Sequence, residues 1–119
     1  MRQSFAVEGR FPSLNEFYRM SPNQQWRIKD ECDGRVEAAA KAAGLRPFTR
    51  PVRYRVTWVE PNRRRDLDNV AFGKKFVQDG LVKAGILHND THHEVRGFAD
   101  EFAYDPKDPR IEVEIWTEE

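Results

Sequence analysis

The chain has 119 residues, of which 39% are hydrophobic and 34% are charged, and its 20 basic side chains balance 20 acidic ones. This length, with eight Phe, three Trp and three Tyr, favours one domain with a sizeable core and argues against a disordered chain. The longest apolar runs are only a few residues, which argues against membrane spans and a signal sequence, so we expect a cytoplasmic protein.

The first third of the chain predicts a strand, a loop and a helix. Phe5 and Val7 fall on one face of an extended segment at residues 3–8. The segment at residues 9–15 contains a glycine, a proline and small polar residues, which argue against regular structure. A helix is expected to follow over residues 22–43.

Both ends of this helix are specified by its sequence. Ser21 is the expected N-cap, Pro22 suits the first helical position, and Gln24 completes a capping box. Gly44 ends the helix. The apolar residues recur at three- and four-residue steps and predict a stripe that packs on a sheet: Ile28, Cys32, Val36, Ala39, Ala40 and Ala43. The single cysteine, Cys32, is therefore interpreted as a small core residue.

The middle of the chain predicts a second strand and a second helix. Alternation at residues 52–58 indicates a strand with one core face and one basic face that carries Arg53 and Arg55. A helix is expected over residues 68–84, with Gly85 as its end.

The last third predicts two strands, at residues 95–104 and 110–117, joined as a hairpin by the turn at residues 105–109. The expected order is β-α-β-α-β-β. We therefore predict a small single α+β domain over residues 1–119, with a mixed sheet and two helices packed on it.

The zero net charge hides an asymmetry along the chain. Residues 1–45 carry seven basic and six acidic side chains, residues 46–75 carry nine and three, and residues 76–119 carry four and eleven. A basic middle block suits a polyanionic partner, but such blocks are as often solvated faces.

The basic block contains a run of arginines followed by two aspartates. Arg63, Arg64 and Arg65 run into Asp66 and Asp68. Residues two apart in an extended backbone point to the same side, so both carboxylates are predicted to converge on one divalent cation. The next residue, Asn69, is a candidate for orienting one of them, and the arginines suit phosphate groups.

Two lysines on the predicted second helix are candidates for assisting the carboxylates. Lys75 lies seven residues after Asp68, which puts both on one side of the predicted helix, and four residues before Asp79. It is therefore expected to reach toward the site and stabilise charge on a phosphoryl group. A surface ion pair between Lys75 and Asp79 is the alternative interpretation. Lys74 points about a hundred degrees away.

Three histidines, His88, His92 and His93, surround Asp90 in an expected loop. No cysteine lies close enough in sequence to complete a zinc site, so we favour histidines without a metal. One of them remains a candidate base or phosphate contact.

These residues together resemble the signature of the RusA-type Holliday-junction resolvases. The resemblance is carried by an ordered series from residues 63 to 95, with a weaker match at residues 11–15: Arg64-Arg65-Asp66-Leu67-Asp68-Asn69, Lys75, Asp79-Gly80-Leu81, Lys83-Ala84-Gly85-Ile86 and Asn89-Asp90. The spacing from Asp68 to Lys75 is three residues longer than in the best-known members, and Thr91-His92-His93 also departs from the family pattern.

The resemblance implies a homodimeric endodeoxyribonuclease that depends on Mg²⁺, with Mn²⁺ as an alternative ion. Such an enzyme binds branched DNA, nicks four-way junctions symmetrically in recombination or repair, and is often encoded by phages. The family's metal-binding and catalytic carboxylates map onto Asp66, Asp68 and Asp90. Its catalytic lysine maps best onto Lys75, which leaves Lys74 as a further candidate and a DNA contact. The implied DNA contacts also include Arg53, Arg55, Arg63, Arg64 and Arg65, with Asn69 and Asp79 in support.

Other functions remain open from sequence alone. The chain also fits a catalytically silent protein that binds DNA structures, or a metal-dependent nuclease or phosphatase on other substrates, including other branched DNA. A protein-interaction module that uses the acidic C-terminal hairpin is a further alternative.

Overall fold

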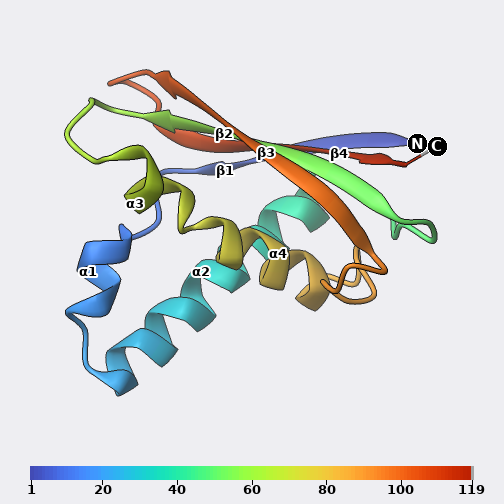
Figure 1. Cartoon of the computed structure of the whole chain (residues 1–119), viewed down its shortest axis with the longest axis horizontal. Coiled ribbons are helices and arrows are strands. Elements are labelled where there is room, and N and C mark those ends of the chain that lie inside the picture. The colour runs from blue at the N-terminus through green and yellow to red at the C-terminus, as the bar shows by residue number, and fades with distance from the viewer. Residues whose placement is uncertain (119) are drawn as a thin grey trace.

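The computed structural model describes residues 1–118 and is built on a mixed four-stranded sheet in the order β1-β4-β2-β3 (Figure 1). The strands are β1 (Arg2–Glu8), β2 (Val52–Glu60), β3 (Val95–Tyr104) and β4 (Arg110–Thr117). β4 pairs antiparallel with both β1 and β2, whereas β3 pairs parallel with β2. The predicted α+β class and mixed sheet are therefore confirmed.

The predicted C-terminal hairpin is wrong, because β2 lies between β3 and β4. The turn at residues 105–109 does not return the chain beside β3 but carries it across β2. β2 alternates buried and exposed residues over most of its length, and its core positions Tyr54, Val56 and Trp58 are almost fully buried. Such an apolar strand is best placed at the centre of the sheet, while the more polar β3 forms an edge.

All four helical segments lie on one face of the sheet and leave the other face open (Figure 1). They are α1 (Leu14–Tyr18), α2 (Pro22–Ala42), α3 (Leu67–Ala71) and α4 (Lys74–Lys83). The order is therefore β-α-α-β-α-α-β-β, and the expectation of two helices is corrected to four segments. No helix among residues 1–118 has the length and hydrophobicity needed to cross a membrane.

The short helix α1 was missed, because it begins inside the predicted loop at residues 9–15. Ser13 and Glu16 form a capping box: the Ser13 hydroxyl accepts from the Glu16 backbone N–H, and the Glu16 carboxylate accepts from the Ser13 backbone N–H. This motif was visible in the sequence, but the glycine and proline just before it outweighed it in the prediction.

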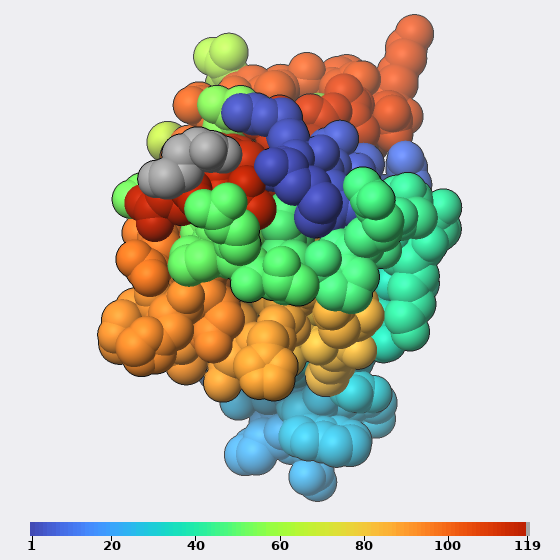
Figure 2. Space-filling view, turned by 90° about the vertical axis from the view of Figure 1, so that its right-hand side faces the viewer, coloured from blue at the N-terminus to red at the C-terminus, as the bar shows by residue number. Residues whose placement is uncertain are grey.

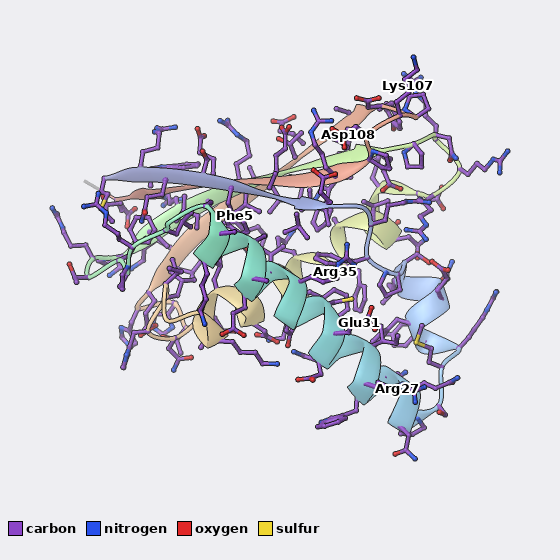
Figure 3. The ribbon with its side chains drawn as sticks, turned by 180° about the vertical axis from the view of Figure 1, so that it is seen from behind. Phe5, Arg27, Glu31, Arg35, Lys107 and Asp108 are labelled. Carbon is purple, nitrogen blue, oxygen red and sulfur yellow. The ribbon has the colours of Figure 1, made fainter. Side chains whose placement is uncertain are left out.

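The helix α2 agrees with its prediction. Ser21 and Gln24 form the expected capping box, and Gly44 adopts a positive φ of 73° just after the helix. The core stripe is confirmed at Cys32, Val36 and Ala40, whereas Ala43 is the exposed C-cap. The Arg35 guanidinium (Figure 3) donates to the backbone carbonyls of Glu8, at the end of β1, and of Arg10, just after it, which ties α2 to the end of β1.

The predicted second helix is broken into α3 and α4 at Phe72 and Gly73. A Cβ at Gly73 would lie 2.9 Å from the Phe11 ring and 3.2 Å from the Trp58 ring, so only glycine allows the chain to pass so close to these core side chains. The break falls between Asp68 and Lys75. The prediction that these two residues share one helical face is therefore wrong.

Gly80 allows α4 to pack closely against α2. A Cβ there would lie 2.5 Å from the Val36 Cβ and 2.8 Å from the Asp33 carbonyl oxygen. We expect Gly80→Ala to lower the free energy of unfolding by about 1–3 kcal/mol, because overpacking outweighs the gain in helix propensity. Gly34→Ala is the matched control, since a Cβ at that position would meet nothing within 4 Å. It should raise stability by about 0.5–1 kcal/mol. Urea unfolding measures both, and equal effects would contradict the close packing.

Candidate active site

The two aspartates of the central motif lie at the start of α3. Asp66 is the N-cap in an extended conformation, and its side chain makes no capping hydrogen bond. Asp68 lies in the first helical turn, where its Oδ1 accepts from the Asn69 backbone N–H at 3.0 Å. The backbone is therefore extended at Asp66 but helical at Asp68. The prediction that an extended backbone turns both carboxylates to one side does not hold for Asp68.

Both carboxylates remain free of cationic partners within residues 1–118, where no arginine or lysine forms an ion pair with Asp66 or Asp68. Both residues are exposed. Oxygen donors of this kind fit a hard divalent cation such as Mg²⁺. The described residues do not, however, bring three or more His, Cys, Asp or Glu side chains into a group able to hold a metal. The assignment of Asp66, Asp68 and Asp90 as ligands remains a prediction.

Asp90 lies in the connection between α4 and β3 and contacts Lys75. The Lys75 Nζ lies 3.5 Å from the Asp90 Oδ2 and 3.2 Å from the Asp79 Oδ1. Burial alone would lower the pKa of Lys75, but hydrogen bonds and charge from Asp79 and Asp90 outweigh it and raise this pKa. Lys75 is therefore held as a cation beside Asp90. The ion pair with Asp79 exists as well, so neither interpretation excludes the other.

Lys74 is engaged elsewhere, by a carboxylate that was not among the predicted site residues. Its ammonium forms an ion pair with Asp100 on β3 and lies 4.3 Å from the centre of the Phe98 ring. Asp100 also accepts a hydrogen bond from the Trp58 indole at 2.9 Å. Trp58 is 2% exposed and lies in the core.

The three arginines before Asp66 point in different directions. The Arg65 guanidinium bonds to the Glu16 carboxylate at 2.5 Å and to the Phe11 carbonyl at 2.9 Å, so it fixes this segment to the start of α1. Arg63 lies 4.6 Å above the Tyr104 ring. Arg63 and Arg64 are both exposed. They are the arginines of the run best placed to meet a phosphate.

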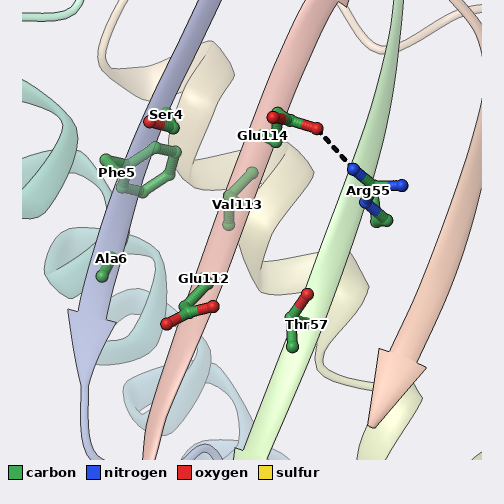
Figure 4. A pocket seen from close by; sticks show the side chains of 8 residues that line it. All are labelled: Ser4, Phe5, Ala6, Arg55, Thr57, Glu112, Val113 and Glu114. Carbon is green, nitrogen blue, oxygen red and sulfur yellow. Dashed lines mark hydrogen bonds and ion pairs between the residues drawn. The ribbon is translucent and has the colours of Figure 1, made fainter.

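Arg53 and Arg55 lie on the open face of the sheet, opposite the helices. Arg55 pairs with Glu114 at 2.7 Å (Figure 4). Arg53 pairs with Glu118 at 3.0 Å. The basic face of the predicted strand is confirmed, but acidic residues neutralise it. Because Asp90 and Lys75 are held on the helical side, these arginines face away from them.

The three histidines are exposed and lie in the connection between α4 and β3, which forms part of the surface in Figure 2 (yellow to orange). The rings of His92 and His93 are tilted against each other with centroids 4.3 Å apart. His88 and His93 line a shallow hollow together with Phe48 and Arg50. Nothing in this arrangement assigns them a role.

The two supporting residues have structural partners. The Asn69 side-chain oxygen accepts from the Asn15 backbone N–H at 3.2 Å, which links α3 to α1. Asp79 pairs with Lys75 and also with Lys29 of α2, whose Nζ lies 2.6 Å from the Asp79 Oδ2. Lys29 was not predicted as a site residue.

A family model matches most of the chain. The family model described as Endodeoxyribonuclease RusA matches residues 16–116, a span that includes both free aspartates and the Lys75–Asp90 contact. No curated protein gives a significant match to the chain.

Proposed function

Because the chain belongs to the RusA endodeoxyribonuclease family, we propose that it is a magnesium-dependent enzyme that resolves four-way DNA junctions by paired, symmetric nicks. The family acts on Holliday-junction DNA, so branched DNA is the expected partner. We further propose that the chain works as a homodimer, because two copies of one site are the simplest source of two symmetric nicks.

The proposal rests on a difference among the carboxylates near the motif, since some form ion pairs with lysines and others do not. Asp79 and Asp100 are paired with lysines, whereas Asp66 and Asp68 are exposed without a cationic partner in the described chain. Exposed carboxylates are stable in water without a partner, but two that are close in sequence and not occupied by arginine or lysine are available to a divalent cation. Their position within the span that matches a nuclease family makes a metal ion the best candidate.

In this proposal Mg²⁺ would be held by Asp66, Asp68 and Asp90. When bound, it supplies charge stabilisation and a more acidic water for hydrolysis of a phosphodiester. Lys75 provides a cation next to Asp90 and stabilises the developing charge on the phosphate. Arg63 and Arg64 attract the DNA backbone to the site, so binding weakens steeply with salt.

The direct test compares synthetic four-way junctions, flaps and linear duplexes as substrates for the purified protein. We expect Mg²⁺-dependent cleavage of junctions at symmetric positions, little cleavage of duplex, and no cleavage in EDTA. Binding without cleavage would instead identify a silent binder of DNA structures. Equal cleavage of all substrates would remove the junction specificity.

A further inference from the structure

A chain of alternating charges runs behind Lys75 into the protein core. It begins at Asp33 on α2, whose carboxylate Oδ2 lies 2.6 Å from the Lys29 Nζ. The same Lys29 Nζ lies 2.6 Å from the Asp79 Oδ2. Asp79 and Asp90 then share the Lys75 ammonium, at 3.2 and 3.5 Å. Five residues from two helices and a loop thus form a continuous network that ends at the candidate site.

The buried end of this network, at Asp33, lowers the stability of the fold. Asp33 is fully buried among the apolar residues of α2, and its Oδ1 has no hydrogen-bond partner within residues 1–118. Its Oδ2 holds Lys29 and also Lys83, at 3.0 Å. Burying a carboxylate is destabilising unless its partners compensate, and an apolar residue often serves stability equally well. Holding Lys29 in one position explains why a carboxylate is buried here.

The position of Lys29 determines the charge balance at Asp79. Burial alone would raise the pKa of Asp79, but hydrogen bonds from Lys29 and Lys75 outweigh burial and lower it below its ordinary value. Asp79 is therefore an anion with two cationic partners. Without Lys29, all of its attraction would act on Lys75. Lys75 would then be drawn toward Asp79 and away from Asp90.

We propose that Lys29, anchored by the buried Asp33, is a positioning residue for the Lys75 ammonium. By neutralising Asp79 it leaves Lys75 free to turn toward Asp90 and the phosphate of the DNA. This inference rests on the proposed function, since it assigns Lys29 to the same cleavage site. Lys29 itself does not touch the DNA.

The test separates cleavage from binding. Lys29→Met is expected to slow single-turnover cleavage of a four-way junction about tenfold, while the junction Kd measured in EDTA changes less than about twofold. Lys29→Arg keeps the charge and should cleave like the wild type. Lys41→Met is the matched control, because Lys41 forms a similar four-residue pair with Glu37 on the same helix but does not contact the network.

A double variant tests whether Lys29 acts through Asp79. Adding Asp79→Asn to Lys29→Met removes the excess attraction, so the double variant should cleave as fast as Asp79→Asn alone. A double variant that stays as slow as Lys29→Met would overturn the inference, as would a fully active Lys29→Met. Lys29→Gln replaces Lys29→Met if the latter does not fold.

A measurement without metal or DNA distinguishes this inference from the proposed function. Carboxyl ¹³C NMR should find the pKa of Asp79 higher in Lys29→Met than in the wild type, and an unchanged pKa would overturn the network. A wild type that cuts no junction removes the proposed function and this inference with it. An active wild type with an unaffected Lys29→Met overturns only the inference.

Discussion

Replacing Asp68 with asparagine is expected to abolish cleavage of four-way junctions while leaving their binding intact. We expect the single-turnover cleavage rate in Mg²⁺ to fall by at least about 1000-fold, because losing one anionic oxygen ligand removes several kcal/mol of transition-state stabilisation. Binding should persist, because it depends on the arginines that contact the phosphates. Quenched-flow cleavage and gel shifts in EDTA measure the two quantities.

Asp68→Asn is expected to change the candidate metal site without changing the fold. Asp68 is exposed and forms no ion pair within residues 1–118, and its carboxylate accepts one short-range hydrogen bond from Asn69. Asparagine retains that acceptor, so stability should change by no more than about 0.5 kcal/mol. Asp108→Asn, in the exposed turn after β3, is the control: Asp108 pairs with Arg110 and not with a candidate site residue, so this variant should cleave normally. Normal cleavage by Asp68→Asn would contradict its assignment as a metal ligand.

The sequence predicted the elements whose signals are local. The strands at residues 95–104 and 110–117 were placed at their observed bounds, and in the second of them the alternating Ile111, Val113 and Ile115 form the buried face. The start of α2 followed from its capping box. The hairpin prediction failed because the order of strands in a sheet depends on contacts between distant segments. Which strand lies between β3 and β4 depends on a pairing between segments more than 40 residues apart, and nothing in the turn at residues 105–109 records it.

The candidate site divides in the same way. The motif made the aspartates and Lys75 candidate site residues because they are close in sequence and match a family pattern, and their assignment stays a prediction. Two ion-pair partners were missed: Lys29, which pairs with Asp79, and Asp100, which pairs with Lys74. Both are distant in sequence, because Lys29 lies 50 residues before Asp79 and Asp100 lies 26 residues after Lys74. The one available signal was Asp33, a charged residue beside Cys32 on the buried side of α2. A buried charge requires partners, and its partners lead to the site.

The two adjacent lysines of α4 should respond differently to replacement by alanine. Lys75→Ala is expected to slow junction cleavage about 100- to 1000-fold, the usual loss when a group that stabilises transition-state charge is removed. Its side chain is 59% exposed, and its partners are Asp79 and Asp90. Stability should therefore fall by no more than about 0.5 kcal/mol. Single-turnover cleavage and urea unfolding measure the two effects.

Lys74→Ala should show the reverse pattern. The Lys74 side chain is only 16% exposed, and its partner Asp100 is 21% exposed, so the substitution leaves a largely buried carboxylate without its cation. We expect a loss of about 2–3 kcal/mol in the free energy of unfolding. Cleavage by the folded fraction should remain close to that of the wild type, because Asp100 holds the Lys74 ammonium against Phe98.

The double replacement Lys74→Ala and Asp100→Asn then separates the structural role from a catalytic one. Without either charge, no buried carboxylate is left lacking a cation, so part of the lost stability should return. The Trp58 indole still has a hydrogen-bond acceptor in the asparagine oxygen. If Lys74 stabilises the transition state instead, this double variant regains stability but not cleavage. A slow Lys74→Ala beside an active Lys75→Ala would transfer the catalytic role to Lys74. It would require the Lys74–Asp100 pair to open when DNA binds.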